Sequence, residues 1–183
     1  MKRNPERRKR RLFDARYVAQ ESRRHYNGAF ILFWSLLLFF VFQRHVISLG
    51  LVSETSMDPT LKPGEMHLIN KYIYLLRAPR RGEIVVLMPG HFDRDEYVKR
   101  VIAVGGDTVS IRNGSVELNG KPLGEPYAHG ATSPSAGPIT IEPGCFFVLG
   151  DNREGSIDSR RFGPVPAKRI QGKIDPRRLF PLN

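Results

Sequence analysis

SETSMDPTL, residues 53–61, directly follows the only long apolar run in the sequence. Pro59 fixes its own φ angle and restricts Asp58, so the chain around Ser56 should hold one conformation. Two interpretations of this stretch remain open. Either Ser56 presents a reactive hydroxyl, or it caps a short helix that begins at Met57 or Asp58, which is the commoner use of Ser before an acidic residue. The choice depends on whether the chain supplies a base for Ser56 elsewhere.

The apolar run before this stretch is interrupted once. Residues 29–42 are apolar except Ser35, and residues 46–52 resume the pattern after a short polar segment that contains Arg44. A helix over residues 29–42 would be about 21 Å long, whereas a hydrocarbon core is about 30 Å thick and a helix over residues 29–52 would reach about 36 Å. We therefore expect one membrane-spanning helix that includes Arg44, whose long side chain can reach the headgroups. A cleaved signal peptide is the alternative, but its polar first region would be unusually long and no small-x-small site follows.

The net charge of +11 is concentrated at the N-terminus. Residues 1–25 hold ten Lys or Arg and three acidic residues, which accounts for +7 of the total. A basic segment before an apolar run predicts a cytoplasmic N-terminus, with everything after the run outside. Nothing resembles a nucleic-acid motif or zinc spacing, so no nucleic-acid partner is expected. Cys145 is the single cysteine, which excludes an intramolecular disulfide and leaves the redox compartment open.

Beyond Leu61 the sequence predicts a mainly β domain. Pro and Gly separate short segments rich in β-branched and aromatic residues, and Asn113-Gly114 is a strong hairpin signal. Residues 127–138 are rich in Gly, Ser, Ala and Pro and should form a surface loop. We expect antiparallel strands over residues 66–74, 83–88, 97–104, 108–112, 115–118, 139–141, 145–149 and 172–174. The predicted organisation is a basic cytoplasmic arm at 1–26, a transmembrane anchor at 27–52 and an antiparallel β-rich domain at 53–183.

Lys99 lies inside an otherwise apolar segment. In a strand it would share one face with Tyr97, Val101 and Ala103. A lysine removed from water on an apolar face has a lowered pKa and can act as a general base. The ordinary alternative is a lysine that reaches solvent or forms an ion pair.

Residues 150–165 are dense in hydrogen-bonding side chains. A solvated loop would explain this composition, and so would a calcium loop, although the spacing of its three carboxylates departs from the known pattern. No metal or other cofactor is therefore expected. A third interpretation is that the segment supports Lys99: Ser156 could hydrogen-bond its amine, and an Asp158–Arg160 pair could brace the loop.

Together these stretches resemble, in order and spacing, the sequence boxes of type I signal peptidases, membrane-bound serine proteases that remove signal peptides from exported proteins. The matching segments are Ser56–Thr60 for the nucleophile box, Arg81–Val86 for an inner strand, Tyr97–Val101 with Gly105–Asp107 for the lysine box, and Gly150–Arg153 with Ser156, Asp158, Ser159 and Arg160 for the last box. Weaker similarities at residues 119–121 and 125–127 extend the resemblance over nearly everything from the apolar run to Val165.

The resemblance implies a Ser-Lys dyad. Ser56 would attack the scissile carbonyl while unprotonated Lys99 accepts its proton. By the same resemblance, the Ser56 backbone N–H would face the oxyanion, Ser156 would orient the Lys99 amine, and Asp158 and Arg160 would support the loop.

The resemblance also implies how a substrate binds. An extended peptide would pair by strand addition and place alternate side chains in shallow pockets, at a region that includes Met57, Glu96, Tyr97 and Val98. Cleavage would follow small-x-small sites, usually Ala-x-Ala. The implied partners are signal peptides of exported precursors and membrane lipids, and the implied location is the bacterial cytoplasmic membrane, crossed once, with the catalytic domain outside.

The sequence departs from this pattern at Glu54, where many relatives have Ser or Gly. A carboxylate there would repel an oxyanion and leaves the second oxyanion donor open. Three rival interpretations remain. One is a specialised peptidase for a single exported substrate such as a pilin, and another is a self-cleaving repressor, which would need a DNA-binding domain in place of the apolar run. The third is an inactive membrane-tethered binding module, against which the presence of Ser56, Lys99 and Ser156 counts.

Overall fold

The structure, a computed structural model, describes residues 28–41, 47–88 and 95–176. It divides into two units, residues 1–44 and 45–183. The predicted basic arm at residues 1–26 lies outside the described residues. Residues 28–41 of the first unit form a helix whose large apolar side chains are exposed. No helix in the described ranges is both long enough and apolar enough to cross a membrane.

The end of the predicted anchor is a strand and not a helix. Ile47–Leu51 form β1, which pairs antiparallel with β2 (Met66–Asn70). Val52 continues this pairing, because its N–H donates to the carbonyl of Glu65 at 3.0 Å. The expectation of a helix reaching residue 52 is therefore wrong. A short apolar run fits a strand as well as a helix, and its periodicity does not distinguish them.

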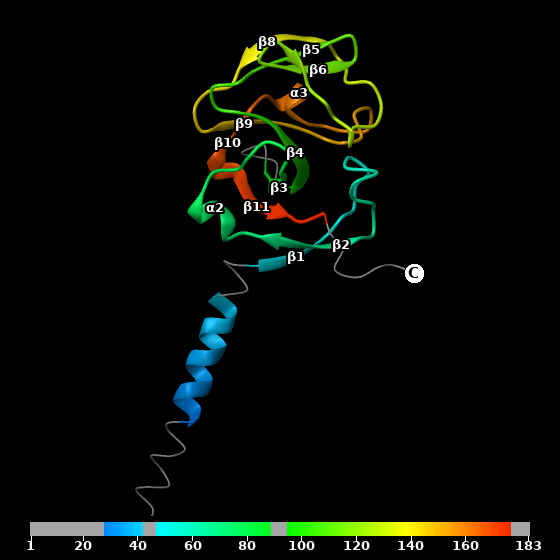
Figure 1. Ribbon diagram of the computed structural model, residues 1–183. Coiled ribbons are helices and arrows are strands. Elements are labelled where there is room, and N and C mark those ends of the chain that lie inside the picture. The colour runs from blue at the N-terminus through cyan, green and yellow to red at the C-terminus, as the bar shows by residue number, and fades with distance from the viewer. Residues whose placement is uncertain (1–27, 42–46, 89–94, 177–183) are drawn as a thin grey trace, which may run out of the picture. The chain divides into compact units, whose positions relative to one another are not determined.

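The second unit is built from two antiparallel sheets (Figure 1). The strands of the larger sheet, in spatial order, are β1, β2, β11 (Ile170–Ile174), β3 (Ile84–Leu87), β4 (Tyr97–Val104), β9 (Cys145–Leu149) and β10 (Val165–Pro166). Those of the smaller sheet are β7 (Lys121–Pro122), β6 (Ser115–Leu118), β5 (Thr108–Arg112) and β8 (Ala136–Thr140). The short helical segments in this unit are α2 (Ile73–Leu76), α3 (Ser159–Phe162) and the 3-10 turn η1 (Ala167–Arg169).

The β-rich antiparallel fold class is confirmed, and β4, β5, β6 and β9 have the predicted bounds. The hairpin between β5 and β6 turns at Asn113 and Gly114, with φ angles of 49° and 78°, as two-residue hairpin turns require. The strand predicted over residues 66–74 stops at Asn70, because the Asn70 side chain accepts the N–H of Ile73 at 3.0 Å and starts α2. β8 begins at Ala136, inside the segment predicted to be a loop.

The larger sheet places β4 between β3 and β9, so both edges of β4 are hydrogen-bonded. One apolar cluster on this sheet contains Val85, Val101 and Val148. Another contains Met57 and Leu61 together with side chains of β3 and β11. The segment that carries Ser56 is thus held against the same sheet that carries Lys99.

Candidate active site

The segment around Ser56 is a series of turns anchored by its apolar side chains. The N–H of Asp58 donates to the carbonyl of Thr55 at 3.1 Å, and that of Leu61 donates to the carbonyl of Met57 at 3.0 Å. Met57 and Leu61 are buried. Residues 56–60 form no helix, so the interpretation of Ser56 as a helix cap is wrong and its hydroxyl is available for another partner.

That partner is Lys99. Its amine donates to Ser56 Oγ at 2.8 Å and to the carbonyl of Val98 at 3.0 Å. Lys99 is 0% exposed and Ser56 is 4% exposed. The amine also lies 5.3 Å from the centre of the Tyr97 ring, which agrees with the predicted shared face. A serine hydroxyl and a lysine amine, 43 residues apart in the chain, therefore meet inside the protein.

The surroundings of Lys99 favour its neutral form. Burial lowers the pKa of its amine from 10.5 to about 8, while the negative charges of Glu54 and Asp158 act in the opposite direction without cancelling the effect. An amine with this pKa is neutral in about one molecule in ten at pH 7, compared with fewer than one in a thousand for an ordinary lysine. Lys99 can therefore accept a proton near neutral pH.

A buried network ties the Ser56 turn to β4. Arg100 donates to the Asp151 carboxylate at 2.8 Å through Nε and at 2.5 Å through Nη2. Thr60, at the end of the turn, donates to the same carboxylate at 2.5 Å. Asp151 is 0% exposed, and the Arg100 guanidinium lies 4.0 Å from the centre of the Tyr127 ring. This network was not predicted from the sequence, although an arginine next to Lys99 in an apolar strand indicates that a buried carboxylate pairs with it.

The loop after β9 lies directly against Ser56. The Asn152 N–H donates to the carbonyl of Ser56 at 3.1 Å, and its side-chain amide donates to the carbonyl of Thr55 at 3.2 Å. A Cβ added at Gly150 would overlap both the Ser156 hydroxyl and the Ser56 carbonyl oxygen. Asn152 was missed at the sequence level, because nothing in its local sequence reveals a partner almost a hundred residues away.

The last three predicted site residues, Ser156, Asp158 and Arg160, lie in this loop and at its end. The expected pair of Asp158 and Arg160 is formed, but the expected bond from Ser156 to Lys99 is not. Asp158 accepts the Gly150 N–H at 3.0 Å and two guanidinium bonds from Arg160 at 2.8 Å each. Burial alone would raise the Asp158 pKa, but Arg160 and the Gly150 N–H together lower it, so the carboxylate stays ionised. The Ser156 hydroxyl is buried and makes no hydrogen bond of good geometry with the described residues, although it lies close enough to Asp158 to help lower the pKa of that carboxyl.

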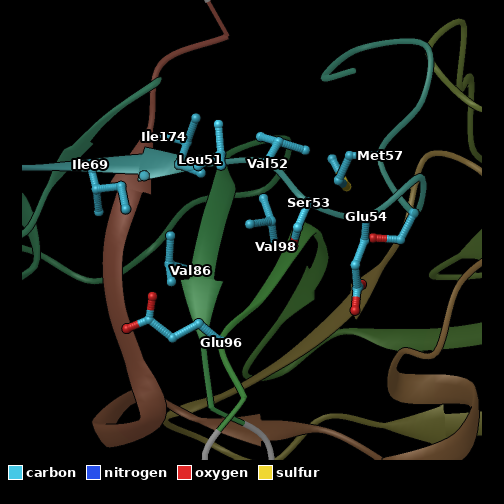
Figure 2. Close-up of a pocket in the computed structure, with 12 residues that line it drawn as sticks. Leu51, Val52, Ser53, Glu54, Met57, Ile69, Val86, Glu96, Val98 and Ile174 are labelled. Atoms are coloured by element: carbon cyan, nitrogen blue, oxygen red, sulfur yellow. The ribbon is translucent and has the colours of Figure 1, made fainter. Parts of the chain in front are cut away.

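Two hollows flank the Ser56 segment. Figure 2 shows the first, which is lined by Ser56 and by apolar side chains that include Met57 and Val98, with Glu96 at one end. It holds about 530 Å³ of space between protein atoms, part of it open to solvent. The second hollow is lined by Tyr97 and Ile157 and by residues 53–55. Of the four predicted substrate contacts, three thus line one hollow and Tyr97 lines the other.

No group of three or more His, Cys, Asp or Glu side chains is placed to hold a metal ion within the described ranges. The geometry of this site is that of a nucleophile and a base, held by polar contacts and bordered by open hollows.

Residues 25–178 match the family model described as signal peptidase, peptidase S26. The chain belongs to this signal peptidase family. Signal peptidase I of Bacillus caldolyticus is 37% identical over 153 residues, 76% of this chain and 80% of that protein. The probable signal peptidase I-2 of Synechocystis is 38% identical over 127 residues, 67% of this chain but only 58% of that protein. A crystal structure of a signal peptidase I from Enterococcus faecalis V583 aligns with a TM-score of 0.47 and 28% identity, over 54% of this chain and 98% of that chain. Membership of the signal peptidase family identifies the chain as a serine endopeptidase.

Proposed function

We propose that this chain is a membrane-bound serine endopeptidase that cleaves N-terminal signal peptides from exported precursor proteins after small-x-small sites. The observation that carries the proposal is the contact of 2.8 Å between the Lys99 amine and Ser56 Oγ, in a place where water is excluded from Lys99. Family membership and relatives named signal peptidase I support the choice of substrate.

The proposed reaction runs through an acyl-enzyme. Ser56 Oγ attacks the carbonyl carbon of the scissile bond while neutral Lys99 takes the hydroxyl proton. Lys99 then gives this proton to the departing amine, and the C–N bond breaks to leave an ester on Ser56. A water molecule attacks the ester with Lys99 again as the base, which releases the signal peptide and restores the Ser56 hydroxyl.

The negative oxygen of the tetrahedral intermediate needs hydrogen-bond donors. We assign one to the backbone N–H of Ser56, which has no acceptor among the described residues. Asp158 supports the site by acting on Lys99 through its charge, and Arg160 and Gly150 keep Asp158 in place. We assign Ser156 a supporting role: rotation of its hydroxyl toward Lys99 would let it hydrogen-bond and orient the amine.

The two hollows suggest how an extended substrate is held. Successive side chains of an extended strand point to opposite sides, and the two hollows share residues 53 and 54 as a common border. Alternate substrate side chains would enter the hollow that contains Met57, Val98 and Glu96, while those between them would face Tyr97. Binding of this kind is strand addition.

We further propose that the chain is held in the bacterial cytoplasmic membrane by a single anchor, with its N-terminus in the cytoplasm. Because β1 occupies residues 47–51, an anchor would have to end before residue 47. The basic N-terminus and the apolar residues 28–41 support this orientation. The exposed apolar side chains of Leu49, Leu51 and Met66 are suited to contact lipid beside the catalytic unit.

Glu54 favours one alternative, a specialised peptidase for a single exported substrate such as a pilin. An exposed carboxylate two residues before Ser56 would exclude many substrates by charge. An inactive membrane-tethered binding module is the other alternative. Such a module would not need the buried contact between Lys99 and Ser56, which argues against it.

The deciding experiment is cleavage of a purified precursor with an Ala-x-Ala site by the detergent-solubilised full chain. We expect cutting at that site by the parent, and none above background by Ser56→Ala or Lys99→Met. Lys121→Met, on an exposed lysine of β7, is the matched control and should cut like the parent. Cleavage by Lys99→Met at the parental rate would refute the dyad, provided that circular dichroism shows all four proteins folded.

A further inference from the structure

Glu54 has an unusual position for a charged side chain in this site. It is exposed, lies two residues before Ser56 and lines both hollows that flank the Ser56 segment. Among the described residues no cation is paired with its carboxylate. Its charge nevertheless reaches the buried amine, because it acts on Lys99. A peptide placed for attack by Ser56 must therefore pass close to this carboxylate.

A second carboxylate, that of Glu96, lies at another end of the first hollow. Figure 2 shows Glu54 and Glu96 on different sides of the hollow, with the side chain of Val98 between them in this view and that of Val86 next to Glu96. Glu96 is also exposed and has no ion-pair partner within the described ranges. The hollow therefore complements a long basic side chain. Its apolar wall can contact the stem, and a carboxylate at either end can attract the positive head.

The charge of these two carboxylates is not balanced locally. Neither hollow is lined by a Lys or Arg. The described cation on which the Glu54 charge acts is Lys99, which is 0% exposed and must lose its charge to act as a base. Among the described residues that line the two hollows, a substrate therefore meets two carboxylates and no Lys or Arg.

We propose that Glu54, together with Glu96, makes the site select precursors that carry a Lys or Arg beside the small-x-small site. This inference rests on the proposed function and assigns a specificity-determining residue to it. A Lys or Arg stem can lie along Val86 and Val98 while its charged head reaches a carboxylate. An acidic residue at the same place would be repelled.

The test is a set of matched precursor peptides with a fixed Ala-x-Ala site. Lys, Gln or Glu is placed in turn at the middle position and at each of the flanking positions, and kcat/KM is measured with the full chain in detergent at low salt. At one or more positions we expect Lys to be cleaved about twofold to fivefold faster than Gln, and Glu more slowly than Gln, the size expected for exposed ion pairs. The difference should shrink at high salt.

Three variants test which carboxylate causes the preference for Lys-containing peptides. Glu54→Gln should abolish most of it, and Glu96→Gln should reduce it at the positions that reach the other end of the hollow. Glu142→Gln removes an exposed carboxylate from the turn between β8 and β9, outside both hollows, and should keep the parental preference. Equal rates for Lys, Gln and Glu peptides with the parent, or a preference unchanged in Glu54→Gln, would overturn the inference.

Binding provides a readout that does not need turnover. In fluorescence anisotropy, the Ser56→Ala chain should bind a Lys-containing peptide about twofold to fivefold more tightly than its Gln counterpart. A charge preference in binding without cleavage by the parent would refute the proposed function and keep the selectivity. Cleavage without any charge preference in rate or binding would refute the selectivity and keep the proposed function.

Discussion

The rate of the proposed reaction should depend on the protonation state of Lys99. Its amine must be neutral to take the Ser56 proton, and burial lowers its pKa to about 8. A general base is active above its pKa, so we expect kcat/KM to rise with pH between about 6 and 8.5 and then level off. The measurement is a pH profile with a precursor for which chemistry limits the rate. A flat profile over this range would contradict the role of Lys99.

Glu54 gives this pH profile a second, independent test. Its negative charge raises the Lys99 pKa, so removing the charge should lower that pKa further and move the midpoint of the profile to lower pH. We expect Glu54→Gln to do this and Glu142→Gln to leave the midpoint where it is. A midpoint that moves upward in Glu54→Gln would show that Glu54 does not act on Lys99 through its charge.

Gly150 is required for packing and not for a special backbone angle. A Cβ at this position would meet the Ser56 carbonyl oxygen and the Ser156 hydroxyl, whereas a Cβ at Gly124 would meet nothing within 4 Å. We expect Gly150→Ala to lower kcat at least tenfold by displacing Ser56, and to cost about 1–3 kcal/mol of unfolding free energy. Gly124→Ala is the control and should change neither. Urea denaturation and cleavage rates test both quantities, and wild-type kcat in Gly150→Ala would show that the loop yields without moving Ser56.

At the scale of elements, the Asp151 network joins the Ser56 turn to the central strand β4. Removing one partner leaves a buried charge without compensation, which typically costs about 3–5 kcal/mol. We expect this loss of unfolding free energy for Asp151→Ala, because Arg100 is then left buried among β3 and β4. Arg112→Gln removes an exposed partner, 62% exposed and 3.7 Å from Glu117, and should cost less than about 1 kcal/mol. Equal losses in the two variants, measured by urea denaturation, would show that the Asp151 network does not hold the turn.

The same elements explain what could be predicted from sequence. A short, largely apolar run predicted β4 at residues 97–104, and the two-residue period of a strand predicted the shared face of Lys99 and Tyr97. It fails further along the strand, where a register shift lies between Val101 and Ala103 and both Ile102 and Ala103 pack into one cluster. A bulge of this kind depends on the partner strand and leaves no signal in one segment.

Other contacts of the site could not be predicted from the sequence for a different reason. The bonds from Asn152 to the Ser56 segment, and from Arg100 to Asp151, join residues distant in sequence. Arg100 in an apolar strand indicates that some carboxylate pairs with it but not which one, and Asn152 alone is compatible with a solvated loop, so only the assembled sheet reveals the partners. The strand β1 was missed because the apolar residues before Ser53 also fit the end of a membrane helix.

At the scale of the whole molecule, the exposed apolar residues of β1 raise the question of what they contact. Leu49 is 62% exposed and Leu51 is 67% exposed, and burying one such side chain fully would gain about 1.5–3 kcal/mol. We expect the full chain reconstituted in lipid vesicles to cleave a precursor faster than in detergent. The double variant Leu49→Ser with Leu51→Ser should lose most of this gain, because the catalytic unit would no longer rest on the lipid surface. Because Leu51 lines the first hollow, the single variant Leu49→Ser is measured beside the double variant. Its cleavage of a short soluble peptide in detergent should be unchanged, since Leu49 lines neither hollow. If the double variant keeps the full vesicle gain, β1 does not contact lipid, and the apolar side chains of Leu49 and Leu51 must be explained by contact with the substrate instead.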